Sequence, residues 1–351
     1  MVWLLALPAA AETLRIATYN VELNRAGPGL LLRDVQKGED PQIAAVVRAI
    51  AALNADVLVL TGFDYDLDQV ALGAFADLLS TAGASYPYRF ALRPNTGLVT
   101  GLDLNGDGYL GGAGDAQGYG RFSGEGGMAV LSRLPIDTAR VRDFSDFLWK
   151  DLPDALLFEG MTPDAVALQR LSTTGHWEVP INLPDGSSLR LLVWYATPPV
   201  FDGPEDRNGR RNHDEAVFWA ALLDGALPYP PPAAPFVILG DANLDPVDGD
   251  GLTSGINLLL AHPALQDAGP RADYLLPEPG HKGDAALDTA DFSAHNGPGG
   301  LRVDYILPSA DLLVAGSGVM WPGPTDPMAA VFATASRHYP VWVDVALPQG
   351  G

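Results

Sequence analysis

Apolar and polar residues alternate along the chain with two different periods. Residues 14–22 alternate residue by residue and end in polar side chains, which predicts a half-buried strand. Residues 41–53 repeat apolar side chains at helical spacing, and the short apolar run at 56–60 predicts a buried strand after that helix. Further strands are predicted at 128–132, 189–194, 236–239, 302–307 and 341–345, and further helices at 72–79 and 212–223.

This order of elements predicts an α/β fold. Strands and helices alternate, yet several neighbouring strands have connections short enough for antiparallel pairing, which favours two mixed sheets packed face to face with helices outside. No repeat of fixed period and no composition break divides the chain, so we expect one domain over residues 12–351. Residues 91–127 are rich in Gly, Asn and Asp without periodicity, which predicts a long insertion loop.

The first eleven residues differ from the rest. Residues 1–11 combine an apolar run, too short to span a bilayer, with small residues in an Ala-x-Ala arrangement. This pattern is typical of the end of a signal peptide, and the alternative is an apolar extension of the first strand. We therefore expect a secreted or periplasmic protein, and no other stretch reaches the length of a membrane span.

The amino-acid composition limits which kinds of catalytic and binding site the chain can form. The 351 residues contain 47% hydrophobic and 18% charged residues, which is enough apolar material for a large core. The absence of cysteine excludes disulfides, thiolate metal sites and cysteine nucleophiles, and leaves histidine and carboxylate chemistry. With 21 basic and 43 acidic residues the net charge is −22, which disfavours wholesale attraction to polyanions but permits a local basic patch or a bound metal ion.

Polar side chains stand at the ends of most predicted strands. When strand ends meet at one rim of a fold, such residues converge and form a site. The residues in these positions are Asn20, Glu22, Asp64, Tyr195, Asp241, Asn243, Asp304 and His338.

Six segments along the chain carry a family resemblance. They are ATYNVE (17–22), ADVLVLTGFD (55–64), GGMAVLSRLPI (126–136), VILGDANLDP (237–246), LRVDYILPS (301–309) and SRHYPVWVDV (336–345). In this order they resemble the endonuclease/exonuclease/phosphatase superfamily. The resemblance implies a four-layer α/β sandwich that hydrolyses phosphoesters by in-line attack of an activated water, usually with a divalent metal ion, Mg²⁺ or Mn²⁺.

The resemblance also implies roles for the residues of the rim. His338 would be the general base that deprotonates water, and Asp304 would orient this histidine. Asp241 and Asn243, two residues apart in an extended segment, would orient the water and hold a phosphate oxygen. The alternatives are a structural histidine and an Asx-rich turn.

Two further positions have a role by resemblance. Asn20 would hydrogen-bond a phosphoryl oxygen or a metal ligand. Tyr195 stands where many members have a second histidine, and its hydroxyl can donate to a phosphate oxygen, as in the abasic-site endonuclease branch. A core tyrosine at a strand end is the equally weighted alternative.

Two positions depart from the family pattern. The metal-binding glutamate of the superfamily falls at Gly62, and the carboxylate before the final histidine is Arg337. In one hypothesis, Glu22 and Asp64 restore a magnesium or calcium site. In the other, Arg337 replaces the cation and binds the phosphate directly. Activity after exhaustive chelation separates the two.

A basic cluster lies in an otherwise acidic chain. Arg207, Arg210 and Arg211 could bind the substrate phosphate. The alternative is a solvated loop that pairs internally with its acidic neighbours, such as Asp206 and Asp214.

The insertion contains a pattern like that of a calcium loop. A D-x-N-x-D-G sequence opens the segment, but the bidentate glutamate of position twelve is absent and position twelve is Gly114. We expect a structural Ca²⁺ to bind here, with the candidate ligands Asp103, Asn105, Asp107, Tyr109 and Asp115.

Together these features predict a phosphoester hydrolase whose substrate is a small molecule or a nucleic acid. Phosphodiesterase, phosphatase and nuclease activity all stay open, and we expect a monomer that depends on a divalent metal. The acidic balance favours small or lipid-derived esters over long polyanions. The alternative is a non-catalytic or metal-independent phosphate-ligand binding protein on the same fold, which Gly62 and Arg337 motivate.

Overall fold

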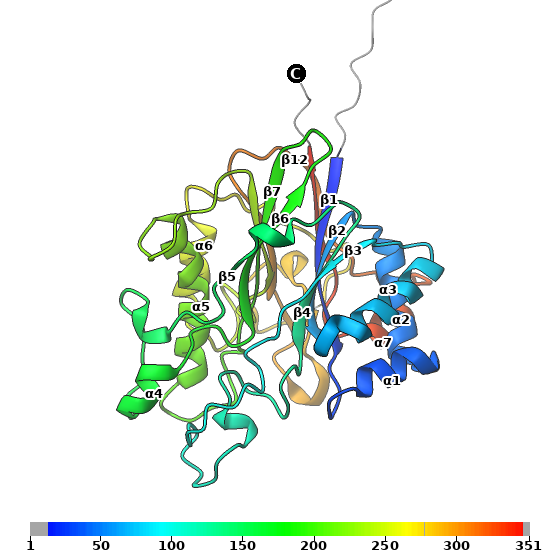
Figure 1. The fold of residues 1–351 in the computed structure, drawn as a ribbon. Helices are drawn as coiled ribbons and strands as arrows, with labels where there is room; N and C mark the ends of the chain where they lie inside the picture. Colours follow the sequence, from blue (N-terminus) through cyan, green and yellow to red (C-terminus); the bar gives the residue numbers. More distant parts are fainter. Residues whose placement is uncertain (1–12, 277, 347–351) are drawn as a thin grey trace, which may run out of the picture.

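Two large β-sheets lie face to face, and helices cover the outer side of each (Figure 1). The structure is a computed structural model, and it describes residues 13–276 and 278–346. The expected signal-peptide remnant, residues 1–11, lies outside the described residues. The predicted α/β class with two mixed sheets and outer helices is confirmed.

The first sheet has six strands and is mixed. Its order is β12 (Val314–Val319), β13 (Val341–Ala346), β1 (Thr13–Leu23), β2 (Val57–Phe63), β4 (Gly127–Ser132) and β3 (Tyr88–Phe90). β1 runs parallel to β2 and antiparallel to β13. The last residues of β1 therefore lie beside the end of β2 and the start of β13, and polar residues from the end of β1 and from the segment before β13 meet there.

The second sheet has five strands. Its order is β11 (Asp304–Pro308), β8 (Phe236–Asp241), β7 (Ser188–Tyr195), β6 (Gly175–Asn182) and β5 (Arg142–Asp143). A separate two-stranded pair is formed by β9 (Ala290–Asp291) and β10 (Gly300–Leu301). β7 and β8 are parallel, and β8 and β11 are antiparallel, so the end of β8 lies between the end of β7 and the start of β11.

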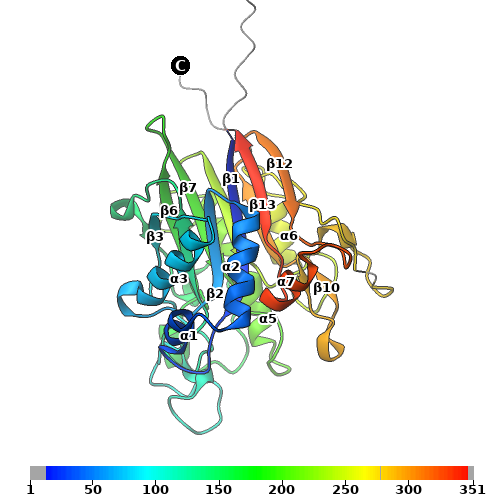
Figure 2. The ribbon, with the colours of Figure 1, turned by 90° about the vertical axis from the view of Figure 1, so that its right-hand side faces the viewer.

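Helices cover the two outer faces. The outer side of the first sheet carries α1 (Leu30–Lys37), α2 (Pro41–Leu53), α3 (Val70–Thr81) and α7 (Ala329–Ala335), as Figure 2 shows. The other side of the molecule carries α4 (Pro163–Leu168), α5 (Arg207–Leu223) and α6 (Ser254–Leu260). α2 begins where the sequence dictates, because Pro41 suits the first turn and the Asp40 side chain caps the N–H of Ile43 at 2.9 Å.

The core has two main parts. Between the sheets, apolar side chains of the first sheet such as Val59 pack with those of the second such as Leu191, and α2 extends this cluster outward. Behind the second sheet, Trp194 of β7 and Trp219 of α5 belong to a second cluster rich in aromatic residues. Burial of these large apolar surfaces is the main stabilising contribution and fixes the strand ends that carry the site.

Most predicted elements are confirmed, with two kinds of difference. α5 begins at Arg207 rather than at residue 212, so the arginine cluster forms the first turns of a helix and is not a loop. The sequence patterns also missed four helices, α1, α4, α6 and α7, and the strands β3, β5, β6, β9, β10 and β12. β12 reads VAGSGV, whose glycines and short length weaken the strand signal. In the 91–127 segment, turns and bends predominate, with a short 3₁₀ turn at Ala113–Asp115.

Candidate active site

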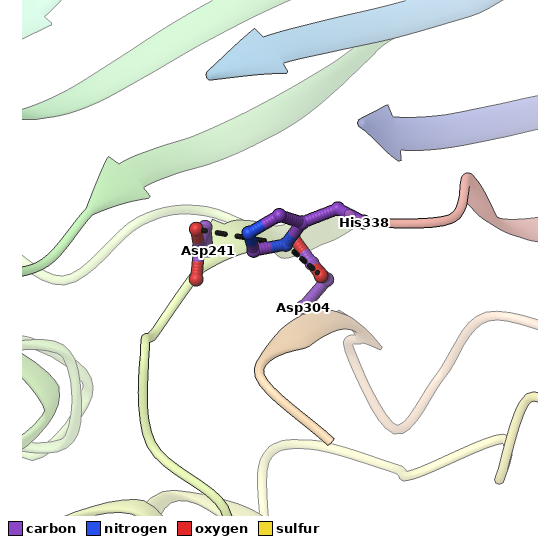
Figure 3. A group of neighbouring side chains, drawn as sticks. All are labelled: Asp241, Asp304 and His338. Carbon is purple, nitrogen blue, oxygen red and sulfur yellow. Dashed lines mark hydrogen bonds and ion pairs between the residues drawn. The ribbon is translucent and has the colours of Figure 1, made fainter. Parts of the chain in front are cut away.

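Four predicted residues meet where the two sheets adjoin. Asp241, at the end of β8, is the cross-strand partner of Asp304, the first residue of β11. Asn20, near the end of β1, donates its side-chain N–H to Asp241 Oδ2 at 2.8 Å and so connects the first sheet to the second. His338 precedes β13 and completes the group, as the close-up in Figure 3 shows. Residues far apart in sequence thus form one buried polar network.

His338 is held by Asp304. Its Nδ1 lies 2.9 Å from Asp304 Oδ2 and 4.0 Å from Asp241 Oδ2 (Figure 3). A carboxylate can only accept, so Nδ1 carries the hydrogen and the second ring nitrogen, Nε2, is left for substrate or water. The same Asp304 oxygen also accepts from Thr289 Oγ1 at 3.0 Å, which fixes the carboxylate.

Burial and the charges within this network shift the pKa values of His338 and Asp241. Burial alone would lower the pKa of His338, but the charge and hydrogen bond of Asp304, together with the charge of Asp241, raise it to about 9. This shift favours the protonated imidazole near neutral pH. Burial and the neighbouring charge of Asp304 raise the pKa of Asp241 well above its ordinary value, which brings this carboxyl close to the working range of a general base.

Tyr195 and Asn243 border the same network. The Tyr195 hydroxyl lies 3.3 Å from the amide nitrogen of Asn20, and Tyr195 is the parallel-strand neighbour of Asp241. Asn243 has a left-handed backbone, with φ of 50°, and its N–H donates to Asp241 Oδ1 at 2.8 Å. The Asn243 side chain donates to the carbonyl of Ala196 at 2.9 Å, so one of its N–H groups already has a protein partner.

β1 and β2 are both irregular at the level of the site. The β1–β2 pairing shifts register between Asn20 and Leu23, and Glu22 has a φ of 46°. Gly62 on β2 has a φ of 68°, and a Cβ added there would lie 2.4 Å from Asn20 Oδ1. This position cannot hold a side chain while Asn20 keeps its orientation, because carbon and oxygen cannot approach so closely.

Glu22 pairs with Arg337. Glu22 Oε1 accepts from Arg337 Nε at 2.8 Å, and Oε2 accepts from the backbone N–H of the same arginine at 2.8 Å. Burial would raise the pKa of Glu22, but the hydrogen bonds and charge of Arg337, with the charge of His338, lower it below its ordinary value. The Arg337 guanidinium also lies 5.2 Å from the ring centre of Phe292, within the range of a cation–π contact.

Glu22 and Asp64 have different hydrogen-bond partners in the structure. Asp64 Oδ2 accepts from the N–H of Arg25 at 2.8 Å, and Oδ1 accepts from that of Gly126 at 2.9 Å. Asp64 therefore fastens two loops, while Glu22 is bound by Arg337. In the described part of the chain, neither carboxylate belongs to a cluster of three or more His, Asp or Glu ligand atoms within 4.8 Å.

The remaining candidate for a metal is the network itself. Over residues 13–276 and 278–346, the one such cluster consists of Asp241, Asp304 and His338. Mg²⁺ prefers six oxygen ligands, whereas this cluster offers two carboxylates and one imidazole nitrogen, all of which already form hydrogen bonds within the network. At Gly62, where the resemblance expects a glutamate ligand, there is no donor. The residues present do not fit the family's divalent cation.

The guanidinium groups of the arginine cluster, Arg207, Arg210 and Arg211, donate to backbone carbonyls, and phosphate binding by these residues stays a prediction. Arg207 Nη2 donates to the carbonyl of Leu104, and Arg210 Nε donates to that of Glu205. Arg211 is 5% exposed, and its guanidinium donates to the carbonyls of Gln117, Arg170, Leu171 and Ser172. The helical start of α5 turns these side chains onto neighbouring backbone.

The carboxylates of the calcium-like loop bind backbone N–H groups. Asp103 accepts from Gly106 and Gly108. The Asp107 side chain accepts from the N–H of Tyr109 at 2.8 Å and from the amide of Asn105 at 3.0 Å. Asp115 is buried and binds the N–H groups of Leu104 and Gly112. These bonds fix the loop, and calcium binding here stays a prediction.

A cavity of about 730 Å³ extends from Tyr195 towards the insertion. Hydroxyl and amide side chains, including Thr96, Thr174 and Asn208, line it together with the exposed aromatic rings of Tyr119 and Phe201. Its acidic side chains are Glu125, Asp202 and Glu205, and the two arginines in its wall, Arg207 and Arg211, bind backbone carbonyls.

The sequence patterns missed three residues that position the site. Ser336 Oγ donates to the carbonyl of Asn20 at 2.8 Å and accepts from the N–H of His338 at 3.1 Å. Thr289 holds Asp304, and the Phe292 ring lies 5.4 Å from that of His338 in an edge-on contact. A serine two residues before the histidine was a usable signal, but nothing near Thr289 or Phe292 in the sequence pointed to them.

Comparison with known proteins agrees with the resemblance. The model of the endonuclease/exonuclease/phosphatase family matches residues 17–338. No curated protein was found to match the chain. An endonuclease/exonuclease/phosphatase from Beutenbergia cavernae DSM 12333 superposes with a TM-score of 0.54 and 20% identity, over 96% of this chain and 72% of that one.

Two other solved structures are similar. An endonuclease/exonuclease/phosphatase from Bacteroides vulgatus has a TM-score of 0.52 and 13% identity over 96% of this chain and 100% of that one. A family protein from Leptotrichia buccalis C-1013-b has a TM-score of 0.51 and 16% identity over 95% of this chain and 100% of that one. At these identities the likeness shows the shared fold.

Proposed function

Because this chain belongs to the endonuclease/exonuclease/phosphatase family, whose members are phosphoester hydrolases and generally metal-dependent, we propose that it hydrolyses phosphoester bonds by in-line attack of water. The observation that carries this proposal is the network of Asn20, Asp241, Asp304 and His338, which joins both sheets. Such a network offers an acceptor for a proton and a cation for a phosphate oxygen at one place.

The electrostatics favour a division of roles between Asp241 and His338. The carboxylates raise the pKa of His338 to about 9, which favours the doubly protonated imidazole near neutral pH, and in that form the ring cannot take a proton from water. This differs from the role of base that the resemblance implies. We propose that Asp241, whose pKa is raised, accepts the proton, and that His338 binds the phosphate through Nε2–H.

In this scheme the reaction balances without a covalent intermediate. The water oxygen forms a bond to phosphorus, its proton passes to Asp241, and the bond from phosphorus to the leaving oxygen breaks. The electron pair of that bond stays on the leaving oxygen, which takes a proton from solvent water and departs as an alcohol, and Asp241 then releases its proton to solvent. Asn20 keeps the Asp241 carboxylate in place, since its N–H lies 2.8 Å from Oδ2.

The cavity supports a small ester with an uncharged leaving group. Its acidic side chains repel further phosphates, and its arginines are bound to carbonyls, so a long polyanion lacks cations to bind. Hydroxyl, amide and aromatic side chains suit a polar, uncharged alcohol instead.

Turnover measurements test the function. We expect the purified chain to hydrolyse p-nitrophenyl phosphate or bis-p-nitrophenyl phosphate, and their ratio distinguishes monoesterase from diesterase. His338→Ala should lower kcat of the folded protein at least 100-fold, and it should also lower the midpoint of urea unfolding, because it removes the partner of the buried Asp304 carboxylate. His281→Ala is the control, because that histidine lies 4.0 Å from Asp248, outside the network. Absence of turnover with both esters and several metals would favour a binding protein on this fold.

A further inference from the structure

The cationic groups in the active site come from the protein. Three carboxylates, those of Glu22, Asp241 and Asp304, belong to the site or adjoin it. A phosphate dianion entering this place needs positive charge, because carboxylates and phosphate repel each other. Arg337 and His338 supply it: one guanidinium, always charged, and one imidazolium.

We infer that Arg337, fixed by Glu22, supplies the positive charge that a divalent cation supplies in other members of the family, so that this chain binds and hydrolyses phosphoesters without a metal ion. This inference rests on the proposed function and deepens it. Members of the family generally depend on a metal ion, and the support for a difference in this chain comes from the residues at its own site.

The first support is the way Arg337 is held. Glu22 accepts from Nε at 2.8 Å and from Nη2, so it binds one edge of the guanidinium and leaves Nη1 for a phosphate oxygen. The backbone N–H of Arg337 bonds to the other Glu22 oxygen at 2.8 Å, and the side chain lies against Phe292. The Arg337 side chain is still 58% exposed, so a ligand can reach it. A guanidinium oriented in this way is preorganised for phosphate.

The second support is that the positions expected to provide metal ligands either lack a side chain or already bind other protein groups. A Cβ at Gly62 would lie 2.4 Å from Asn20 Oδ1, so a glutamate cannot return there without displacing Asn20. Both Glu22 oxygens accept from Arg337, and both Asp64 oxygens accept from backbone N–H groups. The donors that would hold a cation are therefore used within the protein.

The third support is the backbone conformation of Glu22, which directs its side chain to Arg337. Its φ of 46° is a strained conformation for a residue with a side chain, and such strain persists where the surrounding structure requires it. Its N–H lies 3.1 Å from Asn20 Oδ1, so the backbone that presents Glu22 to Arg337 is the same one that presents Asn20 to Asp241. The register shift of β1 between Asn20 and Leu23 thus positions both the partner of the Arg337 guanidinium, Glu22, and the partner of the Asp241 carboxylate, Asn20.

Phosphate binding to the metal-free chain tests the inference. The full chain is treated with EDTA and desalted, its metal content is measured by mass spectrometry, and inorganic phosphate is titrated by calorimetry. We expect phosphate affinity and p-nitrophenyl phosphate turnover to be unchanged after chelation. Arg337→Ala should weaken phosphate binding at least 10-fold, and Arg337→Lys should retain part of the affinity because it keeps the charge.

A matched control separates this effect from a general loss of charge. Arg271 has the same side-chain exposure, 58%, and pairs with Asp284 outside the site. Arg271→Ala should leave phosphate affinity and turnover unchanged. Urea unfolding shows whether each variant is folded. If Arg337→Ala does not fold, the phosphate affinity of Arg337→Lys is compared with that of the unmodified chain instead.

The outcomes distinguish this inference from the proposed function. If phosphate binding or turnover disappears on chelation and Mg²⁺ or Mn²⁺ restores it, a metal is required and the inference is wrong, while the proposed function stands. If the metal-free chain binds phosphate through Arg337 but turns over neither ester, the hydrolase proposal fails and the role of Arg337 in binding stands. Unchanged affinity in Arg337→Ala overturns the inference as well.

Discussion

The side-chain amide of Asn20 donates to Asp241 Oδ2 at 2.8 Å, and this hydrogen bond connects the six-stranded sheet to the five-stranded one. Asn20 lies near the end of β1 and Asp241 at the end of β8, so the bond joins two strands that belong to different sheets. Both side chains are buried. The packing of the two sheets thereby sets the orientation of the carboxylate to which we assign the proton of water.

Replacing Asn20 changes both rate and pH dependence. The hydrogen bond from Asn20 lowers the pKa of Asp241 against the stronger effects of burial and of Asp304. In Asn20→Ala the pKa of Asp241 rises further, so the carboxylate forms only at higher pH. We expect kcat to fall at least 10-fold and the acid limb of the kcat profile to move to higher pH. Asn182→Ala, at an exposed strand end, is the control, and an unmoved acid limb in Asn20→Ala would contradict the role of Asp241 as base.

The alkaline limb of the pH profile should report His338. If His338 acts as a cation, turnover falls as the pH rises through its pKa of about 9. Asp304 is the group that raises this pKa, so Asp304→Asn should move the alkaline limb to lower pH. The kcat of both proteins between pH 5 and pH 10 is the measurement. A histidine acting as base would instead make turnover increase through that range.

Gly62 is expected to be essential for the arrangement of Asn20. In Gly62→Ala a Cβ would meet Asn20 Oδ1, so we expect kcat to fall at least 10-fold and stability to fall by about 1–3 kcal/mol. Gly38→Ala is matched to it, since Gly38 has a φ of 66° and nothing within 4 Å of an added Cβ. That variant should lose about 1 kcal/mol of stability and keep full activity. Equal activity in the two variants would show that the contact with Asn20 does not matter.

Arg211 should affect stability rather than substrate binding. Its buried guanidinium donates to four backbone carbonyls, and Arg211→Ala leaves these acceptors unsatisfied, at a cost of about 3 kcal/mol in the free energy of unfolding. Arg210→Ala is the neighbouring control, with one hydrogen bond to the carbonyl of Glu205 and an expected cost under about 1 kcal/mol. Urea unfolding gives both values. A stable Arg211→Ala with weakened phosphate binding would instead support Arg211 as a phosphate-binding residue.

Calcium binding by the 103–115 loop can be tested separately. Millimolar Ca²⁺ should raise the Tm of the chain, because a ligand that binds only the folded state stabilises it. Asp107→Ala should abolish the increase. Asp185→Ala is the control, since that exposed aspartate accepts from Ser187 in a similar turn. An unchanged Tm with and without EDTA would show that backbone hydrogen bonds alone hold this loop.

Local pattern and family motifs predicted much of the site. Alternating apolar residues located β1 and a continuous apolar run located β8, and the polar residues near the ends of these strands, Asn20 and Asp241, do meet. The motif before β13 placed His338 correctly beside Asp304. These positions depend on the periodicity of individual strands and on motifs of a few residues, both of which a sequence carries directly.

The sequence alone determined the class of fold, the ends of the main strands and the residue types available for chemistry. The tertiary structure decided which partner each charged group has: Glu22 pairs with Arg337 across 315 positions, Asp64 binds the N–H groups of Arg25 and Gly126, and Arg211 turns into the protein. The physical reason is that periodicity reports how a segment faces the core, whereas the partner of a polar group depends on non-local packing and on which buried donors and acceptors still need to be satisfied.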